Sequence, residues 1–258
     1  MSQAEERAAQ ALLAWYVAMG ADEAIGEVPL DCFAAEVKPS AASARQTKVL
    51  ARPLPINAAL LKIGPGSAAA RTAATLAELE ALVAQFDGCP LKRTAKNLCF
   101  ARGRAEARVM LIGEAPGRDE DLQGKPFVGR AGQLLDRMLA GIGLDESHVY
   151  ITNTVYWRPP GNRTPTPQEV EACAPFLARQ IELLAPTVLV LLGGAAAKSI
   201  LEVSEGIMRL RGKWLTYRSA SGEVPVLATL HPAYLLRKPE DKRYAWRDLL
   251  ALKAFLEK

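Results

Sequence analysis

The stretch RVMLIGEAPG, residues 108–117, decides the expected fold. It is a nearly continuous apolar run that passes into a Gly-rich turn, a pattern typical of a strand buried on both faces of a parallel sheet. Similar runs recur at residues 149–155, 187–192 and 224–230, with a shorter, partly exposed one at 213–217. Helical apolar spacing is found at residues 133–142, 168–184, 194–201 and 242–257. This alternation predicts an α/β fold, a three-layer αβα sandwich around a mostly parallel four-stranded sheet.

The first 75 residues differ in composition from the rest. Residues 3–20 have helical spacing that ends at Gly20, and five prolines then fall among Ala, Ser and Gly between about residues 26 and 70. Such a composition is typical of an irregular linker. Because a second amphipathic helix follows at about 75–86, we expect an N-terminal extension at 1–75 and a folded domain at 76–258.

The bulk composition excludes few classes of protein. The chain has 258 residues, four cysteines and a net charge of +4, and this excess lies after residue 75. A mildly basic domain is compatible with nucleic-acid binding but does not require it. No apolar run reaches the ~18–20 residues of a membrane span, and acidic residues near the N-terminus argue against a signal peptide. We therefore expect a cytoplasmic monomer with no membrane contact, whose thiols are reduced and mostly buried.

Polar motifs follow the expected strands, where parallel sheets bind ligands. The first is GEAPGRDEDLQGKPFVGRAGQLLD, residues 113–136. It lacks the GK[ST] ending of a phosphate-binding loop, and its carboxylates would repel a phosphate. They either belong to a site or cap the next helix, and Phe127 is either a core residue or a stacking platform.

The second motif is ITNTVYWRPPGNRTPTP, residues 151–167. Asn153 near the end of a buried strand needs partners for its amide, which offers both a donor and an acceptor for reading a base edge. Neighbouring backbone could satisfy it equally well. The Arg-Pro loop that follows is either a rigid phosphate-binding loop or an ordinary solvated connection.

The third motif is LHPAYLLR, residues 230–237. His231 stands at a strand end and is held by the following proline, so it is a candidate donor to developing negative charge, although a lone histidine is more often structural. The apolar pair and arginine that follow suit a wedge entering a base stack, or else the start of an amphipathic helix.

In this order and spacing, the motifs resemble the family 4 uracil-DNA glycosylases, from about Phe86 to Lys258. By that resemblance, a flipped-out uracil stacks on Phe127, Asn153 reads its polar edge, and His231 donates to O2 of the leaving base. Glu120 and Glu114 are the candidates for offsetting charge on the sugar and positioning water. The pocket lining would include Gly113, Ala115 and Gly117. The implied DNA contacts are Arg158, Arg163, Leu235, Leu236 and Arg237.

Two positions of the turn depart from the better-known family 1. Ala115 stands where family 1 enzymes carry the aspartate that activates water, so the resemblance implies slower chemistry that relies on stabilising the leaving group. Gly117 stands where family 1 has a tyrosine that blocks the methyl group of thymine. The sequence does not indicate what excludes thymine here.

This chain lacks half of the cysteines that hold the iron–sulfur cluster in family 4. Members of that family usually hold a [4Fe–4S] cluster with four cysteines, but here only Cys89 and Cys173 match ligand positions. Lys92 and Trp157 replace the other two, and Cys99 falls at no ligand position. We therefore expect neither a cluster nor another metal.

The leading hypothesis is thus a monofunctional glycosylase that releases uracil from DNA and leaves an abasic site. One alternative is a catalytically inactive module that binds uracil-containing or abasic DNA; retention of Glu120, Asn153 and His231 argues against it. A second is a different α/β nucleotide-binding enzyme, which the absence of GxGxxG and P-loop motifs disfavours. Residues 1–75 could tether a repair or replication partner.

Overall fold

The computed structural model describes residues 66–219 and 222–257, all within one compact unit. The helix expected at residues 3–20 and nearly all of the expected linker lie outside the described residues, so both stay predictions. None of the helices in the described part of the chain is long and apolar enough to cross a membrane.

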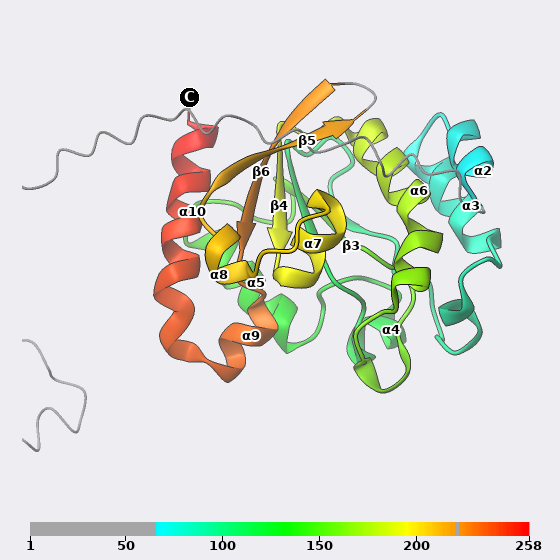
Figure 1. Ribbon diagram of the computed structural model, residues 1–258, viewed down its shortest axis with the longest axis horizontal. Coiled ribbons are helices and arrows are strands. Elements are labelled where there is room, and N and C mark those ends of the chain that lie inside the picture. The colour runs from blue at the N-terminus through cyan, green and yellow to red at the C-terminus, as the bar shows by residue number, and fades with distance from the viewer. Residues whose placement is uncertain (1–65, 220–221, 258) are drawn as a thin grey trace, which may run out of the picture. The chain divides into compact units, whose positions relative to one another are not determined.

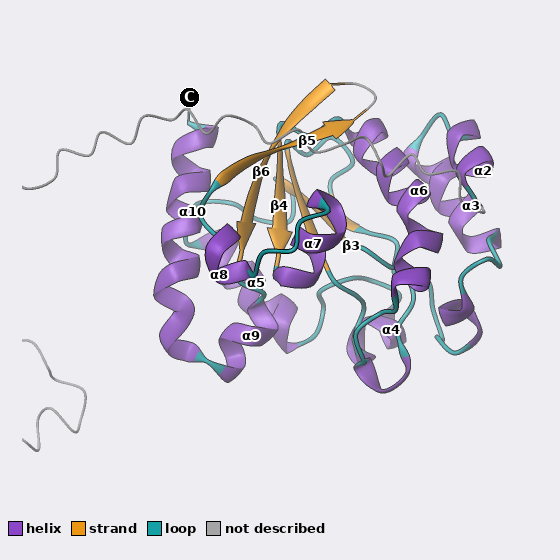
Figure 2. Cartoon of the chain, viewed as in Figure 1, coloured by secondary structure: helices purple, strands orange, loops and turns teal. Residues whose placement is uncertain are grey.

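A mixed sheet forms the centre of the fold (Figures 1 and 2). The strands are β1 (Arg102–Gly103), β2 (Val109–Gly113), β3 (Val149–Asn153), β4 (Val188–Leu192), β5 (Trp214–Ser219) and β6 (Gly222–Thr229), in the order β1-β3-β2-β4-β6-β5. Strands β2, β3, β4 and β6 are parallel, while β1 and β5 pair antiparallel at the two edges.

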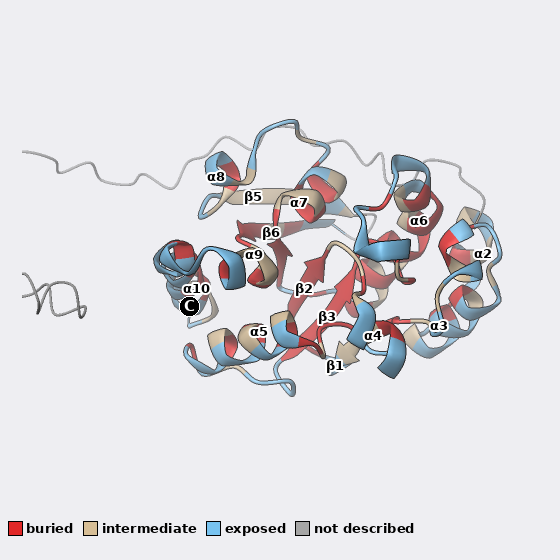
Figure 3. Cartoon of the chain, turned by 90° about the horizontal axis from the view of Figure 1, so that it is seen from below, coloured by how far each residue is buried: buried red, intermediate tan, exposed pale blue. Residues whose placement is uncertain are grey.

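The α/β class is therefore confirmed, but the expected count of four strands is wrong: among the described residues the sheet has six. The four parallel strands are the apolar runs of the sequence. Strand β1 is only two residues long, too short for a periodic pattern, and β5 is mostly half-buried. Figure 3 shows this contrast between the buried central strands and the more exposed edges.

The helices are α2 (Ser67–Thr72), α3 (Leu76–Gln85), α4 (Arg118–Gln123), α5 (Arg130–Ala140), α6 (Pro167–Leu184), α7 (Gly194–Leu201), α8 (Ile207–Leu210), α9 (Pro232–Arg237) and α10 (Lys242–Leu256). Among the described residues, short 3₁₀ turns lie at Pro90–Arg93, Pro160–Asn162 and Pro239–Asp241. The expected helices at 75–86, 133–142, 168–184, 194–201 and 242–257 are confirmed to within a few residues at their ends.

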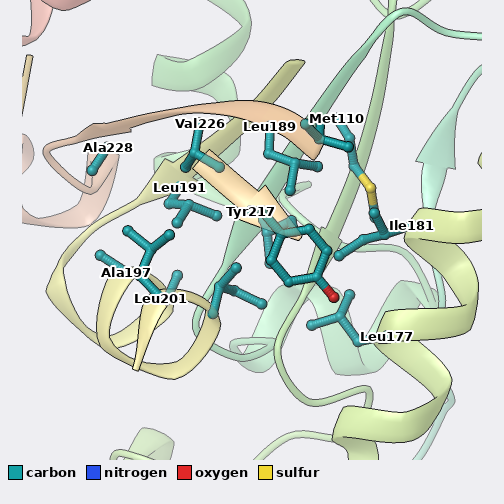
Figure 4. Packing of buried hydrophobic residues seen from close by; sticks show 14 of the residues in the cluster. Met110, Leu177, Ile181, Leu189, Leu191, Ala197, Leu201, Tyr217, Val226 and Ala228 are labelled. Carbon is teal, nitrogen blue, oxygen red and sulfur yellow. The ribbon is translucent and has the colours of Figure 1, made fainter. Parts of the chain in front are cut away.

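Alternate residues of the central strands form two separate cores. Met110 and Ile112 of β2 face a layer that contains α6 and α7, whereas Val109 and Leu111 face α5 and α10. Figure 4 shows the first of these cores, with Leu177 and other α6 and α7 side chains against the sheet. Because successive side chains of a strand point to opposite faces, a continuous apolar run needs cover on both sides. This accounts for the three layers.

A third hydrophobic cluster joins α2 and α3 to α6 (Figure 1). Ala70 and Ala73 are buried in it, together with Leu79 and Val83 of α3. The packed domain therefore includes residues before the boundary that we expected after residue 75. The boundary itself stays a prediction.

Candidate active site

A cavity of about 460 Å³ opens beside the carboxyl ends of the parallel strands. Its walls come from the turn after β2, the loop after β3 and the start of α9, which follows β6. Among the residues expected at the site, the cavity is lined by Glu114, Ala115, Gly117, Glu120, Phe127, Arg163, His231 and Arg237. The three motifs thus meet at one place, because parallel strands end at the same edge of a sheet.

Phe127 has a backbone conformation that its surroundings impose. Its φ of 55° lies in the left-handed region, which a bulky residue rarely adopts. Its carbonyl packs so closely on α5 that a Cβ added at Gly132 would lie 1.7 Å from the Phe127 oxygen. The ring is buried, and its centroid lies 5.6 Å from that of the His231 ring. The fold therefore holds this aromatic face against the histidine.

The Asn153 side chain lies just behind the cavity wall, beside Phe127. A Cβ on Gly113 would lie 2.5 Å from both Asn153 Oδ1 and Phe127 Cζ, so only glycine fits between them. Asn153 is 1% exposed, and neither Oδ1 nor Nδ2 has a hydrogen-bond partner. Within the residues that the structure describes, only Nε of Arg102 shares this state. An unpaired buried polar group costs folding free energy, so the hydrogen-bonding capacity of this amide is unused within the described residues at a cost to stability.

His231 is held as a neutral donor. The backbone N–H of Ala233 donates to Nδ1 at 3.1 Å, so in the neutral ring the proton resides on Nε2. Burial, together with the nearby Arg237 charge, lowers the pKa of His231 to about 4. Gly193 packs against the histidine so closely that a Cβ there would lie 2.9 Å from His231 Cβ. The imidazole is thus fixed in both tautomer and position.

The two candidate carboxylates differ in their surroundings. Glu120 Oε2 accepts a hydrogen bond from the Gly117 N–H at 3.1 Å, and Oε1 accepts one from the Gly129 N–H at 2.9 Å. Both oxygens of Glu120 are therefore oriented by backbone. The Glu114 carboxylate is half-buried on the cavity wall, and among the described residues no hydrogen bond or ion pair reaches it. Of the two, only the Glu114 carboxylate is without a partner among the described residues.

The side chains expected to contact DNA fall into three groups. Leu236 is 38% exposed, and Arg237 lines the cavity without an ion pair in the described part of the chain. Leu235 is fully buried against Leu230 and Ala245, so its assignment as part of a wedge is wrong for this structure. The reason is that Leu235 lies on the side of α9 that packs against the protein, whereas Leu236 is turned about 100° around the helix axis toward solvent. Arg158 and Arg163 are both engaged within the protein.

The comparisons with known proteins agree with this geometry. A family model described as the uracil DNA glycosylase superfamily matches residues 100–250, which include every element of the cavity named above. The chain belongs to the uracil-DNA glycosylase superfamily.

This chain aligns with most of the length of two curated members of the superfamily. A type-4 uracil-DNA glycosylase of Archaeoglobus fulgidus is 46% identical over 156 residues, 59% of this chain and 78% of the relative. One of Pyrobaculum aerophilum is 42% identical over 178 residues, 67% of this chain and 91% of the relative. A type-5 uracil-DNA glycosylase of Pyrobaculum aerophilum is 33% identical over 148 residues, 52% of this chain and 64% of the relative. The resemblance to family 4 is confirmed.

Three of the four positions that hold the iron–sulfur cluster in family 4 lie in the third hydrophobic cluster of this chain. Cys89 and Cys173 are each 1% exposed, and the proximity of the two thiols lowers the pKa of Cys89 and raises that of Cys173. Trp157, at 3% exposure, packs edge-on against Tyr156 in the same cluster. The Lys92 side chain instead pairs with Asp87 at 2.7 Å. These residues supply two thiols and a bulky apolar side chain, a set that does not fit a four-iron cluster.

Several residues that line the cavity of this chain were not predicted from the sequence. Tyr234 lines it three residues after His231, and Asn162 and Thr164 line it from the loop after β3. The helical spacing of Tyr234 from His231 could have indicated its place. Gly132 and Gly193, whose absent side chains make room for Phe127 and His231, carry no such signal, because their role depends on tertiary neighbours.

Proposed function

We propose that the chain is a uracil-DNA glycosylase that binds a flipped-out deoxyuridine and hydrolyses its N-glycosidic bond. The observation that carries the proposal is the unpartnered Asn153 amide beside an aromatic ring and a neutral His231 Nε2–H donor. Uracil presents a matching set: an N3–H donor, the O4 and O2 acceptors and a flat face. A side-chain movement that exposes the Asn153 amide to the cavity would allow it to pair with uracil, and such movements are common on binding.

The proposed chemistry relies on the leaving group. The bond between C1′ and N1 breaks with its electron pair passing to uracil, and the charge that develops on O2 is stabilised by the His231 Nε2–H donor. A water molecule then adds to C1′ and loses a proton, which Glu114 is placed to accept. Because Ala115 offers no second carboxylate in the turn, this order of events puts most of the catalysis on leaving-group stabilisation.

We assign Glu120 a different role from Glu114. A Cβ on Gly117 would lie 2.7 Å from Glu120 Oε2, so this carboxylate fills the space where family 1 enzymes carry a tyrosine. Two backbone N–H groups hold it there. A fixed carboxylate in that position would exclude thymine, because the methyl group would overlap the carboxylate and would displace water from it.

The decisive experiment is a cleavage assay on an oligonucleotide that contains one uracil, with EDTA present. We expect an alkali-labile site at the uracil for the wild-type chain, and a loss of about 10²-fold in kcat for Glu114→Gln, the lower end for removal of a general base because the leaving group carries most of the catalysis. Folded protein that binds uracil DNA without cleaving it would instead indicate the inactive binding module. Cleavage by Glu114→Gln at the wild-type rate would remove Glu114 from the mechanism.

We further propose that the protein contains no iron–sulfur cluster, because Trp157 packs beside the only two thiols at the ligand positions. The purified chain is expected to contain no stoichiometric iron or acid-labile sulfide. The double variant Lys92→Cys/Trp157→Cys, reconstituted with iron and sulfide, is expected to gain about four iron atoms and a broad visible absorption. Trp157→Cys alone, with three thiols, is the control. Iron and sulfide in the anaerobically purified wild-type chain would contradict the proposal.

A cytoplasmic location, a monomeric state and a partner for residues 1–75 stay predictions that accompany this function. Size-exclusion chromatography with light scattering would test the monomer directly.

A further inference from the structure

The loop of residues 158–164 forms one wall of the cavity through Pro159, Asn162, Arg163 and Thr164. Its 3₁₀ turn contains two successive residues in the left-handed region, Gly161 with φ 64° and Asn162 with φ 57°. The residues of this turn are exposed to solvent, so it lacks a core of its own. A wall of this kind keeps its shape only if side chains anchor it from outside the turn.

Glu169 of α6 supplies one anchor. The Arg163 guanidinium donates to both of its carboxylate oxygens, at 2.6 and 2.8 Å, in the bidentate geometry that gives the strongest ion pairs. Glu169 is 4% exposed and also accepts the Thr166 N–H at 2.7 Å, within the capping box of α6. Glu169 therefore caps the start of α6 and, through Arg163, holds the end of the loop.

The electrostatics of this pair keep it charged under any assay condition. The Arg163 guanidinium lowers the pKa of Glu169 to about 2, and Glu169 raises the pKa of Arg163. A carboxylate with a lowered pKa contributes stability that is complete above its unfolded value and is lost only as the pH falls toward 2. The contact is therefore intact at neutral pH.

A second anchor holds the beginning of the loop. Arg158 Nε donates to Asn162 Oδ1 at 2.7 Å across the turn, and its guanidinium lies 3.9 Å from the buried Asp121 carboxylate. Asp121 itself accepts the N–H groups of Lys96 and Asn97. Each arginine of the loop thus pairs with a buried carboxylate: Arg158 with Asp121 of α4, and Arg163 with Glu169 of α6.

We propose that Glu169 is a positioning residue for uracil recognition. Its ion pair with Arg163 fixes the position of the cavity wall, so Arg163 supports the protein structure and does not contact a phosphate of DNA. This inference rests on the proposed function and replaces the phosphate role that the sequence assigned to Arg163. Turning the guanidinium to a phosphate would leave Glu169 buried and unpaired, which is strongly unfavourable. Arg237, exposed at the other side of the cavity without an ion pair among the described residues, is free to contact a phosphate.

The test compares Arg163→Lys with the matched variant Arg218→Lys on a uracil oligonucleotide, because Arg218 is a similarly exposed arginine whose ion pair with Glu223 does not line the cavity. Lysine retains a phosphate contact but not a bidentate pair. We therefore expect Arg163→Lys and Glu169→Gln each to raise KM by about 10- to 10²-fold with a smaller change in kcat, whereas Arg218→Lys stays near wild type. The double variant Arg163→Lys/Glu169→Gln should be little worse than either single variant, because both remove one contact.

The salt dependence of DNA binding separates the two roles of Arg163. Loss of one phosphate contact reduces the slope of log K against log[salt] by about 0.7–0.9. We expect that reduction for Arg237→Gln and not for Arg163→Gln/Glu169→Gln, a neutral pair that also serves if the single variants do not fold. A reduced slope for that double variant, or tighter DNA binding by Glu169→Gln through a freed guanidinium, would overturn the proposal. A wild-type chain that fails to cleave uracil DNA would instead overturn the proposed function.

Discussion

Replacing Asn153 by leucine is expected to abolish uracil release while making the folded protein more stable. The amide is 1% exposed and has no partner in the free protein, so it carries a desolvation cost that a leucine of similar size removes. The free energy of unfolding should rise by about 1–3 kcal/mol, which corresponds to roughly 2–4 °C in Tm per kcal/mol for a domain of this size. A site that hydrogen-bonds a substrate loses on the order of 10⁴-fold in kcat/KM when the pairing is removed. Thermal melting and the uracil cleavage assay measure the two effects.

Thr152 provides the matched control on the same strand. Its hydroxyl donates to the Phe100 carbonyl at 2.7 Å in the core, so this buried polar group is satisfied. Thr152→Val should lower the free energy of unfolding by about 1 kcal/mol, because the carbonyl loses its partner, and should leave cleavage close to wild type. Loss of stability in Asn153→Leu, with cleavage retained, would show that the asparagine is structural.

Replacing His231 by alanine is expected to lower kcat by about 10²- to 10³-fold with little change in KM, because its Nε2–H donates to charge that develops only as the bond breaks. His148 is the only other histidine and is exposed beside Asp145, 2.7 Å from it. His148→Ala is therefore the control and should cleave at the wild-type rate. Equal losses in the two variants would assign His231 no part in catalysis.

The same histidine sets the response of the reaction to acid. Because the pKa of His231 is lowered to about 4, the ring is neutral from pH 5 upward, and kcat should show no step near the ordinary value of 6.5. The folded state should lose stability as the pH falls from 6.5 to about 4, since the unfolded chain then binds a proton that the folded chain does not. A pH–rate profile and an NMR titration of the ring would measure both; a step in kcat near 6.5 would contradict the neutral donor.

Much of the architecture could be predicted because it follows from periodicity. The run that contains Val109–Gly113 predicts a strand covered on both faces, and the structure places one core against Met110 and another against Val109. The same order of strands and motifs predicted that Asn153 and His231 would meet at one edge of the sheet. Strand β1 could not be predicted, since two residues carry no pattern and pair only because β3 lies beside them.

The amino-acid sequence by itself determined the fold class, the superfamily and the residue types at the site, because these depend on local apolar patterns and on motifs read in order. Only the tertiary structure decided which side chains are available. It buries Leu235 and exposes Leu236, and it pairs Arg163 with Glu169. It also leaves the Asn153 amide without a partner in the part of the chain that it describes. Burial and pairing are properties of neighbours brought together from distant parts of the chain, and no single segment encodes them.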